Sequence, residues 1–352
     1  MELFTHTDFD DHEQVVFAHD QATGLKAIIA VHSTRLGPSL GGCRIWNYGS
    51  EAEALTDVLR LSRGMTYKAA LAGLALGGGK SVVLADSRTQ KTPEMMRALG
   101  CAVERLAGRY IVAEDVGATV DDMDEIAKET RHVSGVSSGA GDPSPWTARG
   151  VFLSMQAAAQ YRWGKGLEGR LVSVTGLGNV GKRLCWMLHE AGAKLVVSDI
   201  QENAVEHVRS KTGAVAIDPA QAHAIDADIF APCALGAGLN AQTIPELKAE
   251  IICGAANNQL ATAADGPRLA ERGILYAPDY LVNAGGLISV ARPALNMPDA
   301  EAGAKLKDIP KTLETVFVEA ASRNVSTDVA ADLLAEARLA PDTVGGASRK
   351  SA

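Results

Sequence analysis

No uninterrupted apolar run in these 352 residues reaches the ~18 residues that a membrane-spanning helix needs. Positive charge is not in excess either, because 34 Lys and Arg face 42 Asp and Glu and the net charge is -8. Since general nucleic-acid binding requires a basic face, we expect neither a membrane nor a nucleic acid as partner. The N-terminal segment MELFTHTDFDDHE lacks the basic and apolar regions of a secretory signal, so we expect a cytoplasmic protein.

Cysteines are few and widely spaced, and no C-x-x-C pair occurs among them. An odd number of distant cysteines fits neither a disulfide framework nor a zinc site. We therefore predict reduced thiols and no metal site. The five residues are Cys43, Cys101, Cys185, Cys233 and Cys253.

The chain does have the length and the apolar content for two domains. Of its residues, 47% are hydrophobic and 22% are charged, as in ordinary globular proteins, which excludes a largely disordered chain. Glycine is abundant, with 35 residues, and much of it is clustered. Clustered glycine predicts turns in which the backbone approaches a ligand closely.

The pattern of apolar residues divides the chain. The first part mixes strand-like and helical segments, and a Gly-, Ser- and Pro-rich stretch at residues 134–145 then predicts a hinge. Beyond it, strands and helices alternate, which predicts a parallel sheet covered on both faces. We therefore expect a two-domain α/β fold. Residues 1–140, completed by C-terminal helices at about 325–342, form the first domain, residues 141–330 form a doubly wound Rossmann domain, and residues 343–352 form a disordered tail.

Individual elements follow from the same periodicity and from helix caps such as Thr92 before Pro93. The strands expected are 25–33, 110–113, 171–175, 194–198, 228–231, 251–254 and 274–277. The helices expected are 52–65, 93–106, 121–129, 147–161, 179–191, 204–211, 309–322 and 327–337.

The segment VSVTGLGNVGKRL carries Gly176, Gly178 and Gly181 in G-x-G-x-x-G spacing, between an apolar strand and a helix. In a dinucleotide site the first glycine permits a tight turn, the second admits the pyrophosphate, and the third lets the helix pack on the strand. Asp199 ends the next strand, where a carboxylate binds the adenosine ribose hydroxyls and repels a 2′-phosphate. Three glycines alone also fit an ordinary turn, but in this context they predict NAD binding.

Two lysines stand out because they lie in mostly apolar, glycine-rich surroundings. LGGGKS at residues 76–81 is similar to a P-loop, but the first glycine of that motif would fall at Leu74, so we expect no nucleoside triphosphatase. Lys68 and Lys80 have a possible partner in Asp115, at the end of an apolar strand, although exposed lysines are the ordinary alternative. Burial and a second cation lower the pKa of a lysine and make it usable as a base near neutral pH.

Six motifs follow one another along the chain: RGMTYK (63–68), LGGGK (76–80), AEDVG (113–117), GLGNVG (176–181), GAAN (254–257) and APDYLVNAGG (277–286). Taken in this order, they resemble the glutamate/leucine/phenylalanine/valine dehydrogenase superfamily, and its leucine dehydrogenase branch most of all. The resemblance runs from about Phe9 to about Ala340. It implies reversible NAD-dependent oxidative deamination of an L-amino acid to the 2-keto acid and ammonia, in a homo-oligomer (dimer, tetramer or octamer).

By this resemblance, Lys68 binds the substrate carboxylate and Lys80 activates the water that attacks the imino acid. Asp115 moves protons to and from the substrate amino group. Gly41 and Gly42 bring the backbone close to the substrate and offer its carboxylate a hydrogen-bond donor. The resemblance also implies hydride transfer between the α-carbon and nicotinamide across a cleft between the domains, which closes to exclude water.

The resemblance also implies further contacts with the cofactor. Asn257 and Asn283 are expected to hold the nicotinamide ribose and the substrate, with a turn or a helix cap as the ordinary alternative. The Ser134 hydroxyl, where relatives often carry Thr, is expected near the nicotinamide carboxamide. The remaining contacts expected are Asn179, Val180, Cys233, Ala234 and Ala255.

The substrate side chain is expected to be apolar. Glutamate-specific members carry a lysine in place of Leu40 and a second polar residue at the position of Val290, and without them a buried γ-carboxylate would be unpaired. An apolar pocket suits Leu, Ile or Val, while Phe or Trp stays an alternative. A catalytically silent NAD-binding protein is disfavoured because Lys68, Lys80 and Asp115 are all present. The residues expected to line the pocket are Leu40, Met65, Ala113, Leu287 and Val290.

Overall fold

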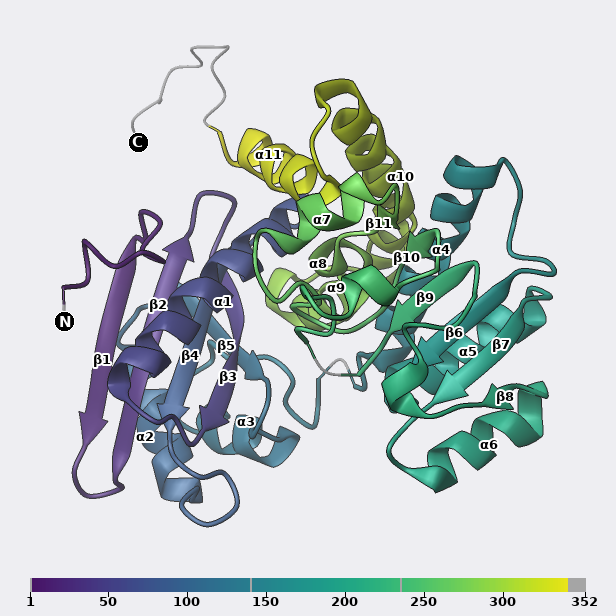
Figure 1. The fold of residues 1–352 in the computed structure, drawn as a ribbon. Coiled ribbons are helices and arrows are strands. Elements are labelled where there is room, and N and C mark those ends of the chain that lie inside the picture. The colour runs from purple at the N-terminus through teal and green to yellow at the C-terminus, as the bar shows by residue number, and fades with distance from the viewer. Residues whose placement is uncertain (1, 140, 235, 341–352) are drawn as a thin grey trace.

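The computed structural model describes residues 2–139, 141–234 and 236–340, and it contains two β-sheets with helices packed on them and between them (Figure 1). The strand order is β1-β2-β4-β3-β5 in the first sheet and β11-β10-β9-β6-β7-β8 in the second. The predicted two-domain α/β fold is therefore confirmed. The tail predicted at 343–352 lies outside the described residues.

The first sheet is mixed: β1, β2 and β4 pair antiparallel, whereas β4, β3 and β5 run parallel. Side chains of β2 alternate between the faces, so that Ile28 and Ala30 pack with α1 while Ala27 and Ile29 pack with α2 and α3. The strands are β1 (Gln14–Asp20), β2 (Leu25–Ser33), β3 (Ser39–Trp46), β4 (Gly77–Leu84) and β5 (Tyr110–Glu114). The helices are α1 (Glu51–Leu71), α2 (Pro93–Glu104) and α3 (Val120–Ala127).

The glycine clusters of the first domain lie inside strands, in β3 and at the start of β4, so the prediction of turns was wrong here. A Cβ on Gly78 would overlap Thr66 of α1, and a Cβ on Gly41 would overlap the backbone of Gly79. These glycines let β4 approach both α1 and β3 more closely than any side chain would allow.

All the strand pairs of the second sheet are parallel, and the strand order reverses between β6 and β9. This is the doubly wound order of dinucleotide-binding domains, in which the ligand lies at the reversal. The strands are β6 (Leu171–Thr175), β7 (Lys194–Ser198), β8 (Val215–Ala216), β9 (Ile229–Pro232), β10 (Ile251–Ile252) and β11 (Leu275–Tyr276). The helices are α4 (Ser144–Trp163), α5 (Asn179–Glu190), α6 (Glu202–Thr212) and α7 (Asp265–Glu271), with short 3₁₀ turns at Pro219–Gln221 and Ile244–Glu246.

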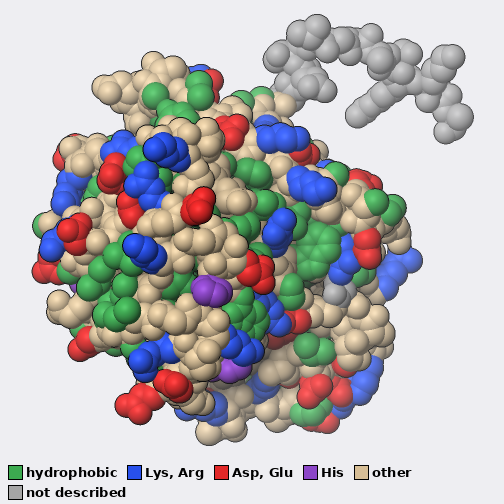
Figure 2. All heavy atoms as spheres, turned by 90° about the vertical axis from the view of Figure 1, so that its right-hand side faces the viewer, with side chains coloured by type: hydrophobic (Ala, Val, Ile, Leu, Met, Phe, Trp, Pro, Cys, Tyr) green, Lys and Arg blue, Asp and Glu red, His purple; other side chains and the backbone are tan. Residues whose placement is uncertain are grey.

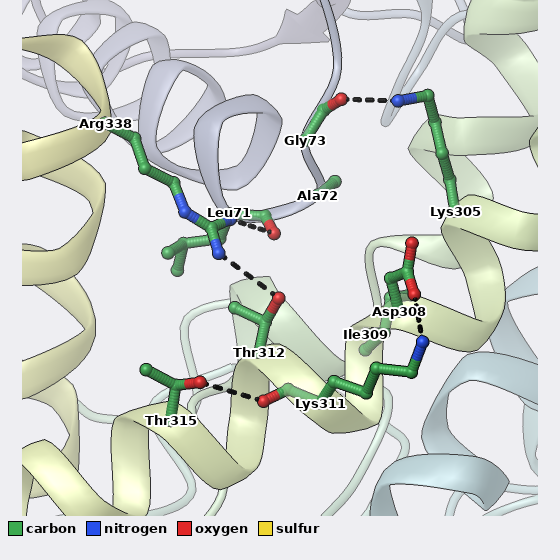
Figure 3. A pocket seen from close by; sticks show the side chains of 10 residues that line it. All are labelled: Leu71, Ala72, Gly73, Lys305, Asp308, Ile309, Lys311, Thr312, Thr315 and Arg338. Atoms are coloured by element: carbon green, nitrogen blue, oxygen red, sulfur yellow. Dashed lines mark hydrogen bonds and ion pairs between the residues drawn. The ribbon is translucent and has the colours of Figure 1, made fainter.

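Four further helices join the two halves: α8 (Asp279–Val282), α9 (Gly285–Leu295), α10 (Asp299–Arg323) and α11 (Thr327–Leu339) (Figure 1). Arg338 of α11 donates hydrogen bonds to the carbonyls of Ala70 and Leu71 at the end of α1, at 2.9 and 2.7 Å. Lys305 of α10 donates to the carbonyl of Gly73 at 2.6 Å, and these groups line a cavity at the junction (Figure 3). The C-terminal helices therefore cap α1 and tie the two halves together.

The surface on the side of the second sheet carries charges of both signs. In Figure 2 basic, acidic and apolar side chains are intermixed on this face, in keeping with a net charge of -8. Among the described residues, no helix has both the length and the apolar character needed to cross a membrane.

Candidate active site

Lys80 and Asp115 form an ion pair between β4 and the end of β5, the two strands that flank β3 in the first sheet. Lys80 lies within β4 and is 5% exposed, and its ammonium donates a hydrogen bond to Oδ2 of Asp115, which directly follows β5. Arg44 Nε lies 3.8 Å from the same oxygen. Burial opposes ionisation of this carboxyl group, but Lys80 and Arg44 together hold the pKa of Asp115 below its usual value. The pair is a carboxylate and an ammonium that could exchange a proton with a ligand bound beside them.

Gly42 keeps the space beside this pair free. A Cβ at this position would lie 2.6 Å from Cβ of Asp115 and 3.2 Å from Nζ of Lys80. β3 is held in place at this point because the buried Tyr110 hydroxyl of β5 donates to the carbonyl of Gly41 at 2.8 Å. The backbone of β3 therefore borders the ion pair with no side chain in between.

Lys68 brings a second ammonium to the site from the last turn of α1. Its Nζ donates to Oδ1 of Asn257 at 3.2 Å, which connects the first domain with the loop after β10. Burial lowers the pKa of Lys68 to about 8; the nearby Lys80 adds to this effect, while Asp279 and Asp115 oppose it. Such a partly buried cation is suited to binding a carboxylate.

Asn283, at the end of α8, is 4% exposed and points its amide toward the same loop. Its Nδ2 donates to Oδ1 of Asn257 at 2.8 Å and to the carbonyl of Ala255 at 3.2 Å. Its Oδ1 is buried and has no hydrogen-bond partner among the described residues. A buried acceptor without a donor is costly, so this atom fits a hydroxyl or amide donor of a bound ligand.

The glycine loop has the shape that a dinucleotide needs. Gly176 has a φ of +91°, and a Cβ there would lie 2.6 Å from the backbone nitrogen of Ala234. A Cβ on Gly181 would overlap the carbonyl of Gly176, whereas a Cβ on Gly178 would meet nothing within 4 Å. Because Gly178 caps α5 with no side-chain hydrogen bond, the first N–H groups of this helix are open to an anion.

Asp199 lies directly after β7, close to the same loop. Its carboxylate accepts hydrogen bonds from the N–H groups of Leu177 at 2.6 Å and Gln201 at 2.8 Å. The loop and Asp199 therefore form one hydrogen-bonded unit that fits a nicotinamide dinucleotide. Of the other residues predicted to contact the cofactor, Asn179 and Val180 begin α5, and Cys233 and Ala234 follow β9 on the other side of the reversal.

Ser134 connects the predicted hinge with α9. The residue is 2% exposed, and its hydroxyl donates to the carbonyl of Val290 at 2.8 Å. Four of the five predicted pocket residues share one apolar cluster that includes residues of both domains: Leu40 and Leu287 belong to it, and Met65 and Val290 pack against it. Ala113 is buried outside that cluster.

Three residues of the site were not singled out from the sequence: Arg44, Tyr110 and Asp279. Asp279 stands inside the motif APDYLVNAGG, and Arg44 lies two residues after Gly42. Asp279 follows the apolar strand β11 closely, and a carboxylate after an apolar strand is the same signal that identified Asp115. Tyr110 carries no such signal, because a buried tyrosine in a strand is ordinary.

Comparison with known proteins adds to this geometry. Residues 12–132 match the family described as Glu/Leu/Phe/Val dehydrogenase, dimerisation domain, and residues 139–205 and 198–341 match Glutamate/Leucine/Phenylalanine/Valine dehydrogenase. Leucine dehydrogenase of Geobacillus stearothermophilus is 51% identical over 343 residues, which cover 96% of this chain and 94% of the relative. Valine dehydrogenase of Streptomyces virginiae is 47% identical over 95% of each chain.

A solved structure is similar to this chain over nearly the same length. The crystal structure of L-tryptophan dehydrogenase from Nostoc punctiforme superimposes with a TM-score of 0.83 at 47% sequence identity, and it covers 93% of this chain and 96% of that one. Hetero-hexameric glutamate dehydrogenase from Thermus thermophilus has a TM-score of 0.76 at 22% identity. At this identity the likeness concerns the fold alone.

Proposed function

The chain belongs to the Glu/Leu/Phe/Val dehydrogenase family and is an amino acid dehydrogenase, and we propose that Leu, Ile or Val is its substrate, with NAD as cofactor. The reaction is the reversible oxidative deamination of the amino acid to its 2-keto acid and ammonia. The observation that carries this reaction is the Lys80–Asp115 pair, with the second cation, Lys68, close enough for both residues to act on its pKa.

Each polar group has a task in this reaction. The Lys68 ammonium and the backbone of Gly41 and Gly42, which carries no side chain, bind the substrate carboxylate. Asp115 takes a proton from the substrate amino group, and Lys80 in its neutral form takes a proton from the water that attacks the imino acid. When bound, the nicotinamide would accept the hydride that leaves the α-carbon. Once the ammonium forms again, it stabilises negative charge on the attacking oxygen.

The carboxylate of Asp199 supports NAD rather than NADP. We expect Asp199→Ala to raise KM for NAD about tenfold to a hundredfold, because hydrogen bonds from the ribose hydroxyls to a charged acceptor are lost. Turnover with NADP should rise at the same time, since the charge that repels a 2′-phosphate is gone. Initial rates with each cofactor measure both effects.

Glu202→Ala, which removes an exposed carboxylate three residues further along, is the matched control and should leave both constants unchanged. An Asp199→Ala enzyme with unaltered KM for NAD would contradict the assignment of this residue.

Substrate preference is tested with a panel of L-amino acids. We expect kcat/KM to be highest for Leu, Ile or Val and lowest for Glu, because the predicted pocket residues include no side chain that would pair with a γ-carboxylate. Differences among the aliphatic substrates should be modest, since one methylene contributes about 1–3 kcal/mol in such a pocket.

An aromatic substrate is the second candidate. It is favoured by the L-tryptophan dehydrogenase of Nostoc punctiforme, which is 48% identical to this chain over 330 residues. Fastest NADH formation with Trp or Phe in the same panel would replace the aliphatic assignment and leave the chemistry of Lys80 and Asp115 as it stands.

We infer that the protein works as a homo-oligomer in the cytoplasm, and that residues 1–140 form the domain that binds substrate and associates. β1 is an edge strand of the first sheet, and its Phe17 is 57% exposed, which is typical of a surface that pairs with another chain. The five cysteines are all free, as in a reducing compartment. Analytical ultracentrifugation tests the oligomer, and a monomer at micromolar concentration would contradict it.

A further inference from the structure

Asp279 is a buried carboxylate to which the reaction described above assigns no task. It is the first residue of α8, directly after Pro278, and is 7% exposed. Its Oδ2 accepts the backbone N–H of Gln259 at 3.0 Å, and its Oδ1 accepts that of Tyr280 at 2.8 Å. Carboxylates are seldom this deeply buried unless a cation or several donors hold them.

Hydrogen bonds from both ends of α8 hold the loop that follows β10. Asp279, at the start of the helix, holds Gln259, and Asn283, at its end, donates to Oδ1 of Asn257 at 2.8 Å. The Gln259 side chain closes the loop on itself, because its Nε2 donates to the carbonyls of Gly254 and Ala256 at 2.9 and 3.0 Å. The loop is therefore fixed on both sides of Asn257.

The atom held by this arrangement is the one that Lys68 contacts. Oδ1 of Asn257 accepts from both Asn283 and Lys68, so the position of the loop sets the position of the Lys68 ammonium. A shift of Gln259 would move Asn257, two residues before it, and with it the donor that faces the substrate.

Asp279 and Lys68 also interact through their opposite charges. The charged groups that act on Lys68 are Asp279, Lys80 and Asp115; burial lowers the pKa of Lys68, and Asp279 opposes that effect more than Asp115 does. Burial raises the pKa of Asp279, while the N–H of Gln259, the Lys68 ammonium, the N–H of Tyr280 and the Tyr276 hydroxyl favour its ionised form.

We propose that Asp279 is a positioning residue for the substrate carboxylate site, which anchors the Asn257 loop through Gln259 and supplies the counter-charge that keeps Lys68 cationic until substrate binds. The proposal rests on the proposed role of Lys68. It assigns to Asp279 no contact with substrate and no proton transfer.

The test is Asp279→Asn, with kcat and KM for leucine measured from pH 6.5 to 10. Loss of the negative charge lowers the pKa of Lys68, so less of it is cationic at a given alkaline pH. The fall of kcat/KM on the alkaline side should therefore begin about 1 pH unit lower than in the wild type. KM for leucine should rise about tenfold at pH 9, with a much smaller change of kcat at saturation.

Asp265→Asn is the matched control, because Asp265 is also buried in the second domain, at 1% exposed, and bonds Thr262 and Arg268. It should lower thermal stability and leave the pH profile unchanged. Tyr276→Phe is the milder second variant, since it removes the hydroxyl that accepts the backbone N–H of Asp279 at 3.3 Å but leaves the charge of Asp279 in place. It should raise KM for leucine by less than Asp279→Asn does, without a shift of the pH profile.

A pH profile that does not shift in Asp279→Asn would overturn the proposal, as would an unchanged KM for leucine in Tyr276→Phe if the first variant fails to fold. KM for leucine in Lys68→Ala distinguishes a failure of the role proposed for Asp279 from a failure of the role proposed for Lys68. A large rise of KM in Lys68→Ala combined with an unshifted Asp279→Asn refutes the role of Asp279 alone. An unchanged KM in Lys68→Ala refutes the proposed role of Lys68, and the role of Asp279 with it.

Discussion

Lys80→Ala is expected to reduce kcat for leucine oxidation about a thousandfold, because it removes the group that accepts a proton from water and later stabilises charge on the attacking oxygen. Asp115 keeps Arg44 as a cationic neighbour at 3.8 Å, so the site retains a compensated carboxylate and the fold should persist. NADH formation at alkaline pH, followed by absorbance, measures the loss. NAD binding should be retained, since the glycine loop belongs to the other domain.

Lys26→Ala is the matched control for this variant. Lys26 lies on β2 of the same sheet but is exposed to solvent, so kcat should stay at the wild-type value. A Lys80→Ala enzyme that kept more than a tenth of wild-type kcat would refute the assignment of Lys80 as the base.

Gly42→Ala is expected to lower kcat about a hundredfold although it adds a single methyl group. That methyl would lie 2.6 Å from Cβ of Asp115, 2.8 Å from the carbonyl oxygen of Glu114 and 3.2 Å from Nζ of Lys80. The backbone of Glu114 is paired with β3 in the sheet and cannot yield as a long side chain could, so the ion pair must shift. Misplacement of reacting groups by about 1 Å costs roughly this factor in rate.

Gly64→Ala provides the contrast, because a Cβ at this exposed position of α1 would meet nothing within 4 Å. Removing a glycine from a helix interior should stabilise the fold by about 1 kcal/mol, visible as a higher unfolding midpoint in urea, with kcat unchanged. If Gly42→Ala were as active as Gly64→Ala, β3 would not border the reacting groups as described.

Local signals predicted much of the fold. Strands 25–33, 171–175 and 194–198 have the predicted bounds, and Thr92 caps α2 by accepting the Met95 N–H at 3.2 Å. These elements could be predicted because a cap or a run of β-branched residues acts over a few positions. α10 begins at Asp299, ahead of the predicted start at 309, because its first turns are mostly exposed and show little apolar periodicity.

β3 and β4, which border and carry Lys80, were harder to predict. They contain consecutive glycines, which alone favour turns, and only the close approaches of α1 to Gly78 and of β4 to Gly41 make glycine necessary there. β1 was missed as well, because on an edge strand most side chains are partly or fully exposed and the alternation is weak. In each case a tertiary contact overrides the local preference.

By itself the sequence determined the division into two α/β domains and the dinucleotide loop with Asp199. It also identified Lys68, Lys80 and Asp115 as candidate site residues. Each of these depends on residues that are close in the chain or on a motif that spans a few positions. Only the tertiary structure decided which of these groups meet. The Lys80–Asp115 pair joins residues 35 positions apart, and the contact of Lys68 with Asn257 joins residues 189 positions apart across two domains. No local pattern encodes such separations, because they follow from how the sheets and their helices pack. The burial that shifts the pKa of Lys68, and that gives Asp279 its influence on it, exists only in the folded chain.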